Sequence, residues 1–243
     1  MWLVDACIYH VRHVSRELVP TGDSNLVKSM LSWISMLMHE HCQSEEEAQK
    51  NKHLKHWLFC ATMFGAVWSI GATSDTDSRV KFDAFYRELL RGKCADYPIP
   101  EAIGKLESQM PENGLVYDFF YQMKNKGEWR HWNDLLKSGE SSGSEKKVKN
   151  IRQIMVPTMD TVRIFYLLDY CIKHKRPILM CGPTGTGKSA YIQNYLMNSL
   201  SKEEYMAFFV NFSAQTSANQ VQEIFMSMLD KRRTGFFGPP MMR

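Results

Sequence analysis

One stretch of the chain has the residue types and spacing of a phosphate-binding loop. It matches the pattern GxxxxGK[ST] at every fixed position, and its residues are Gly182, Pro183, Thr184, Gly185, Thr186, Gly187, Lys188 and Ser189. Glycines let such a loop turn sharply and bring backbone N–H groups against phosphate oxygens, which the positive end of the next helix also stabilises. Lys188 would bridge the β- and γ-phosphates, and the Ser189 hydroxyl would bind Mg²⁺. The motif therefore predicts ATP or ADP with Mg²⁺ as ligands.

The segments beside this loop predict the setting that its chemistry requires. The apolar run Ile178–Cys181 before it predicts a strand, and the apolar positions Tyr191, Ile192, Tyr195 and Leu196 after it predict an amphipathic helix. A strand, a glycine-rich loop and a helix in this order form the known nucleotide-binding unit.

The region from residue 151 to residue 243 alternates between predicted strands and helices. Further strands are predicted at Ile154–Val156 and Met206–Phe212, and helices at Val162–Ile172 and Val221–Leu229. Strands that alternate with helices predict a parallel sheet, and hence the α/β class.

Hydrolysis needs a further group, a carboxylate on a second apolar strand that holds Mg²⁺ and orients water. The predicted strand Met206–Phe212 runs into Ser213, and no later apolar run ends in an acidic pair. We therefore assign no catalytic residue, and we expect only the first half of a parallel-sheet subdomain.

Residues 1–96 are predicted to be helical. An element over Leu3–Leu18 is followed by a helix capped by Asp23 or Ser24, and another helix ends at Gly92. The uncharged stretch Trp57–Ser74 approaches the length of a membrane span. Its glycines and hydroxyl residues favour a helix buried within a domain, so we expect no membrane partner.

Residues 97–150 are interpreted as a connector. Val116–Tyr121 predicts an aromatic-rich strand, and Ser138–Asn150 combines Gly and Ser with charge, which is typical of a loop.

The composition excludes several classes of protein. The chain has 243 residues, of which 44% are hydrophobic, and a net charge of +4, which is too small to indicate a nucleic-acid partner. Lys231, Arg232 and Arg233 are interpreted as basic residues that complement a helix end. Six scattered cysteines and an N-terminus without a signal-peptide pattern favour the cytoplasm.

Four ordered motifs resemble the motor region of dynein heavy chains of the axonemal type. They are Ile154–Arg163 (IMVPTMDTVR), the GPTGTGKS loop, Asn211–Ala218 (NFSAQTSA) and Leu229–Gly235 (LDKRRTG) followed by Phe237–Pro240 (FGPP). They resemble the opening of the third AAA+ module of that motor ring. Earlier segments, including Trp68–Ala72 (WSIGA) and Val116–Asp118 (VYD), resemble the end and the lid of the second module.

This resemblance implies a helical lid subdomain followed by the first half of a P-loop AAA+ subdomain. It also implies that Val156 and Pro157 lie beside the adenine. The implied partners are other dynein subunits and, through the full motor, microtubules, and the implied location is the cytoskeleton of the ciliary axoneme. The family continues past Gly-Pro-Pro to a strand with paired aspartates, whereas here Met241, Met242 and Arg243 follow Pro240.

Two alternatives stay open at the level of sequence. The chain could be a self-standing P-loop nucleotide kinase or NTPase. It could also be an interaction piece that binds neighbouring dynein parts without nucleotide.

Overall fold

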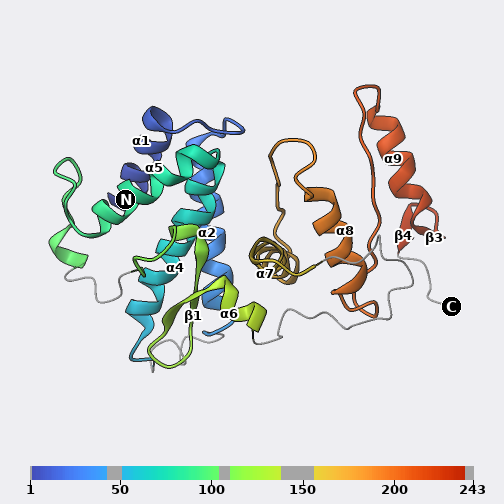
Figure 1. Ribbon diagram of the computed structural model, residues 1–243. Coiled ribbons are helices and arrows are strands. Elements are labelled where there is room, and N and C mark those ends of the chain that lie inside the picture. Colours follow the sequence, from blue (N-terminus) through green and yellow to red (C-terminus); the bar gives the residue numbers. More distant parts are fainter. Residues whose placement is uncertain (1, 43–50, 104–109, 138–155, 239–243) are drawn as a thin grey trace. The chain divides into compact units, whose positions relative to one another are not determined.

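The computed structural model describes residues 2–42, 51–103, 110–137 and 156–238 (Figure 1). The chain divides into two compact units, residues 1–199 and residues 200–243. The first unit contains the N-terminal helices and the phosphate loop, and the second contains the C-terminal segment. The predicted loop Ser138–Asn150 and most of the predicted strand Ile154–Val156 lie outside the described residues.

Helices form the N-terminal region, as predicted. They are α1 (Trp2–Val14), α2 (Asp23–His39), α4 (Leu54–Ser69), the 3₁₀ turn η1 (Gly71–Thr73) and α5 (Thr76–Leu90). The first predicted element was too long, because α1 ends at Val14. The backbone beyond it bonds to the turn before α5 instead: the Leu18 N–H donates to the Thr73 carbonyl at 2.8 Å, and the Asp75 N–H donates to the Arg16 carbonyl at 3.0 Å.

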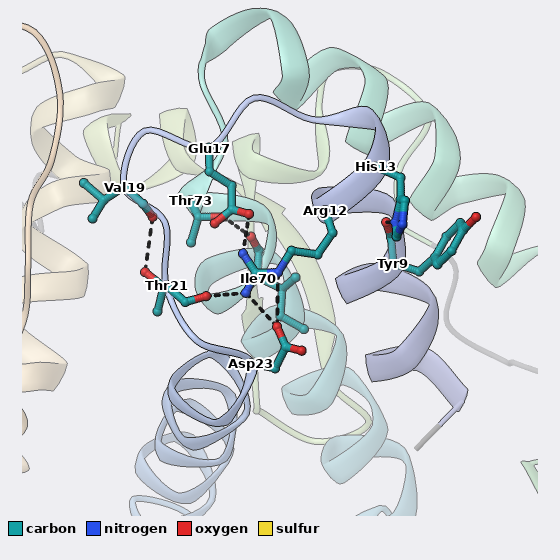
Figure 2. A network of polar contacts seen from close by, with 9 residues as sticks. All are labelled: Tyr9, Arg12, His13, Glu17, Val19, Thr21, Asp23, Ile70 and Thr73. Atoms are coloured by element: carbon teal, nitrogen blue, oxygen red, sulfur yellow. Dashed lines mark hydrogen bonds and ion pairs between the residues drawn. The ribbon is translucent and has the colours of Figure 1, made fainter.

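The cap predicted for α2 is wrong. Gly22 is the N-cap residue, no side chain caps the helix, and Asp23 is the first helical residue. The Asp23 carboxylate instead accepts from Arg12, whose guanidinium also contacts Glu17 and the Thr21 carbonyl (Figure 2). Arg12 competes for this carboxylate more strongly than the helix N-terminus because a charge-assisted bond exceeds a neutral one. The network holds the segment between α1 and α2.

Helix α4 is the central element of the first unit. Met63, Ala66 and Val67 belong to a core cluster with α1, α2 and α5, while Cys60 and Phe64 belong to a second cluster with α2 and α7 (Met159–Lys173). A helix that is buried on two faces needs an apolar sequence all round. The uncharged stretch Trp57–Ser74, most of which forms α4, therefore belongs to the core. Among the described residues, no helix has the length and apolar character to cross a membrane.

The connector contains the 3₁₀ turn η3 (Val116–Asp118), a hairpin of β1 (Phe119–Gln122) and β2 (Glu128–His131), and the helix α6 (Trp132–Lys137). The strands pair antiparallel, with Phe119 opposite His131. Only the second half of the strand predicted at Val116–Tyr121 is a strand, because η3 turns the chain before it. The buried Trp132 indole donates to the Tyr117 carbonyl at 2.8 Å and joins the start of α6 to the turn η3.

Helix α7 confirms the helix predicted around Val162–Ile172. Its buried residues Val162, Leu167 and Cys171 pack into the second core cluster, with residues of α2, α4 and β1. After it comes α8 (Lys188–Asn198), which begins with the last two residues of the phosphate loop and confirms the helix predicted there.

The strand predicted at Ile178–Cys181 is absent from the structure. These residues belong to no helix or strand, and Leu179 is 80% exposed. An extended segment becomes a strand only when a neighbouring segment takes up its backbone hydrogen bonds. In the described residues no segment pairs with this one, and the described sheets are two antiparallel hairpins.

The second unit contains α9 (Ala218–Ser227) and a hairpin of β3 (Asp230–Arg233) and β4 (Phe236–Gly238). Ser217 caps α9, but none of the residues of α9 is buried. The strand predicted at Met206–Phe212 is also wrong, for the same lack of a pairing segment. Lys231 and Arg233 lie in β3 rather than at a helix end, because the Thr234-Gly235 turn (Gly235 φ +79°) folds the chain back into a hairpin.

Candidate nucleotide site

The backbone of the phosphate loop has the turns that its glycines predict. Gly185 has φ of +85° and Gly187 has φ of +81°, a region that side-chain-bearing residues rarely adopt. Gly187 is the N-cap residue of α8, so the helix begins at Lys188. The loop therefore ends where the first free N–H groups of a helix begin, which is the local geometry of an anion site.

Lys188 folds back over the loop. Its ammonium donates to the Gly182 carbonyl at 3.0 Å, to the Pro183 carbonyl, and to the Thr186 hydroxyl at 3.0 Å. The Thr186 hydroxyl in turn donates to the Pro183 carbonyl at 3.0 Å. The positive charge thus lies within the loop, and these neutral acceptors are weaker than phosphate oxygens. A phosphate group can replace them.

Ser189 is the second residue of α8 and is exposed. Its hydroxyl stands in the first turn of the helix, where the motif expects the Mg²⁺ ligand. Among the described residues, no group of three or more His, Cys, Asp or Glu side chains could hold a metal ion. The Ser189 hydroxyl is the group of this motif that would hold Mg²⁺, together with phosphate oxygens of a bound nucleotide.

Val156 and Pro157, the residues expected at the adenine, lie apart from the loop along the chain. Both are exposed, Val156 by 69%, in the segment that enters α7. Thr158 caps that helix, since its hydroxyl accepts from the Thr161 N–H at 3.3 Å. This cap fixes the first turn of α7, and Val156 and Pro157 directly precede it in the chain. Helix α7 packs against α8, the helix that follows the loop, and the contact of Val156 and Pro157 with the adenine stays a prediction.

Tyr195 links α8 to α7, a role that sequence reasoning did not assign. It is the one buried residue of α8, with 4% of its surface exposed. Its hydroxyl donates to the Asp169 carboxylate at 2.7 Å, and its ring packs edge-on against Phe165 at 5.3 Å. The apolar pattern of α8 included Tyr195 but did not predict its partner, because the partner lies in another helix.

The face of α7 that packs into the core is electrically neutral. Burial raises the pKa of the Cys171 thiol to about 11, and burial also raises the pKa of Tyr166 and Tyr170 well above the ordinary value. These groups keep their protons at neutral pH. The charged residues of the helix form ion pairs away from this face, Arg163 with Asp160 near its N-terminal end and Lys173 with Asp169 near its C-terminal end.

The two halves of the chain match two protein families. Residues 1–134 match the family described as dynein heavy chain AAA lid domain, and residues 144–243 match the family described as P-loop containing dynein motor region. The chain is 45% identical to dynein axonemal heavy chain 12 of Mus musculus over 242 residues, or 99% of this chain and 8% of that protein. It is 54% identical to the protein of that name from Rattus norvegicus over 179 residues, or 74% of this chain and 6% of that protein.

A third relative, dynein axonemal heavy chain 3 of Homo sapiens, is 37% identical over 250 residues, which cover 99% of this chain and 6% of that protein. The helical region and the glycine loop thus define an α/β chain of the AAA+ P-loop class, with a lid domain followed by part of a P-loop domain. The chain belongs to the dynein heavy chain family. It spans 6% to 8% of the length of these relatives.

Proposed function

We propose that this chain binds MgATP or MgADP through the loop from Gly182 to Ser189, as part of a dynein motor ring. The observation that carries the proposal is the joint position of the loop, the folded-back Lys188 and the start of α8. Lys188 and the free N–H groups of α8 would neutralise the phosphates, and Ser189 would hold Mg²⁺. Val156 and Pro157 would contact the base.

The wider role follows from the family. We propose that the protein acts in microtubule-based movement of cilia, with other dynein subunits and microtubules as its partners and the axonemal cytoskeleton as its location. The names of the relatives, which are axonemal dynein heavy chains, support this proposal. The family matches favour it over a self-standing nucleotide kinase. We assign no catalytic residue within the described part of the chain, and hydrolysis is not part of the proposal.

The test is the titration of the chain with MgADP by calorimetry, in the wild type and in the variant Lys188→Ala. We expect the variant to lose binding, because it removes the charge that faces the phosphates. Lys175→Ala is the matched control, since Lys175 is an exposed lysine two residues after the end of α7, and it should bind as the wild type does. Equal affinity of Lys188→Ala and the wild type would show that this loop is not the site.

A further inference from the structure

Arg163 connects the first turn of α7 to two segments of the N-terminal region. One of its guanidinium nitrogens lies 3.8 Å from the Asp118 carboxylate and 3.5 Å from the Tyr117 carbonyl. The guanidinium carbon lies 5.8 Å from the centre of the Trp68 ring, on α4. Only 18% of the Arg163 side chain is exposed, and only 17% of the Asp118 side chain. The contact is therefore largely shielded from water, which strengthens its electrostatic part.

The same guanidinium also fixes the start of its own helix. Arg163 forms an ion pair with Asp160, three residues earlier in the first turn. Thr158, which caps this turn, directly follows Val156 and Pro157. Arg163 thus holds the turn from both sides, through Asp160 within α7 and through Asp118 and Trp68 outside it.

The rest of α7 is held by other contacts. Tyr166 packs between Phe120 and Trp132, at ring distances of 5.5 and 5.1 Å, and Leu168 and Cys171 are buried further along the helix. Removal of the Arg163 side chain should therefore leave the helix docked. It should free only the first turn, and with it the segment that carries Val156 and Pro157.

We propose that Arg163 is a positioning residue that sets the base-contacting segment of the nucleotide site against the lid. The proposal rests on the proposed function, because it assumes that Val156 and Pro157 contact the base. It predicts a division of labour. Lys188 governs the affinity for the phosphates, whereas Arg163 governs the preference for adenine over another base.

The experiment compares the dissociation constants of MgADP and MgUDP by calorimetry. Both ligands present the same diphosphate to the loop, so their ratio reports on the base. We expect the wild type to prefer MgADP, and we expect Arg163→Ala to lower this preference about fivefold while MgUDP affinity stays unchanged. Arg163→Lys, which keeps the charge but not the flat guanidinium above Trp68, should lower it less. Arg163→Lys also tests the proposal if Arg163→Ala does not fold.

Arg91→Ala is the matched control. Arg91 pairs with Glu112 at 2.8 Å and is more exposed than Arg163, so its loss should leave the ratio unchanged. An equal fall in the affinities for both nucleotides in Arg163→Ala would show a general structural role and overturn the proposal, as would an unchanged ratio or a wild type without preference for adenine. The failure of the proposed function is distinct, since it would appear as binding that survives Lys188→Ala or as no binding by the wild type.

Discussion

At the scale of single residues, the phosphate loop depends on backbone conformations that only glycine adopts without strain. Gly187 combines a φ of +81° with a tight surrounding, since a Cβ there would lie 3.2 Å from the Tyr191 ring. Gly185 has a similar φ of +85°, but nothing lies within 4 Å of its Cβ position. Alanine substitutions at the two glycines would therefore separate the cost of backbone strain, which both positions share, from the cost of steric crowding, which only Gly187 has.

We expect Gly187→Ala to weaken MgADP binding by about tenfold, because a left-handed conformation costs roughly 1–2 kcal/mol in a residue with a Cβ and the ring of Tyr191 must also move. Calorimetry measures the affinity. Gly185→Ala should weaken binding less, and Gly22→Ala, where φ is −66° and the space is open, should leave it unchanged. A Gly187→Ala variant that binds as well as the wild type would contradict the geometry of the loop.

The residues of the loop could be recognised from the sequence, because the motif is contiguous and its chemistry resides in local backbone. Arg163 and Tyr195 could not. Their partners, Asp118 and Asp169, lie 45 and 26 positions away, and only the packing of the helices brings each pair together. A single sequence holds no local signal for such a contact.

At the scale of elements, α1 docks on α5 through a buried histidine. The ring of His10 stacks on Phe85 at 4.1 Å, and its Nε2 atom is buried without a hydrogen-bond partner among the described residues. Burial, with a contribution from Lys81, lowers the pKa of His10 below its ordinary value. The helix pair therefore packs with a neutral imidazole.

This packing predicts a loss of stability in acid. The unfolded chain binds the proton of His10 more tightly than the folded chain, so the contribution of this group is complete above the unfolded pKa of about 6.5 and falls as the pH drops below it. Urea unfolding at pH 7.5, 6.5 and 5.5 measures the change. Burial also lowers the pKa of His41, so the two histidines share the loss.

The variant His10→Gln measures how much of this loss of stability in acid comes from His10. It should unfold more easily than the wild type at pH 7.5 but lose less stability between pH 7.5 and pH 5.5. His13→Gln, at an exposed position on the same helix, should keep the pH dependence of the wild type. The same dependence in His10→Gln and the wild type would mean that the buried imidazole does not titrate with unfolding.

At the scale of the whole molecule, the two units differ in how much apolar surface they bury. The core clusters draw their residues from the first unit, including α7. In the second unit, α9 has no buried residue, and Phe208, Phe212, Phe225 and Phe236 are exposed. Local opening costs little where few apolar contacts must break.

Hydrogen exchange followed by mass spectrometry should therefore divide the chain near residue 200. We expect slow exchange in α4, which packs into both core clusters, and rapid exchange in α9. Helix α7 is the internal control, because it belongs to the same matched P-loop region as α9 but has a buried face. Exchange in α9 as slow as in α4 would show that the second unit is stable by itself.

The sequence by itself determined the features that depend on neighbours along the chain. These are the glycine turns of the loop from Gly182 to Ser189 and the start of α8, the helices whose apolar residues recur at helical spacing, and the buried nature of α4. The nucleotide ligand of the loop stays a proposal. The division into residues 1–96, 97–150 and 151–243 stays a prediction. Each confirmed feature depends on residues that are at most a few helical turns apart along the chain.

Only the tertiary structure decided the features that need a distant partner. The runs Ile178–Cys181 and Met206–Phe212 have the apolar composition of strands, yet neither is a strand, because a strand requires hydrogen bonds from another segment and none of the described residues supplies them. In the same way, the contacts of Arg163 with Trp68 and Asp118 exist because α7 docks on the lid. The residue types of a segment determine which structures and contacts it can form, and its neighbours in space determine which of these it does form.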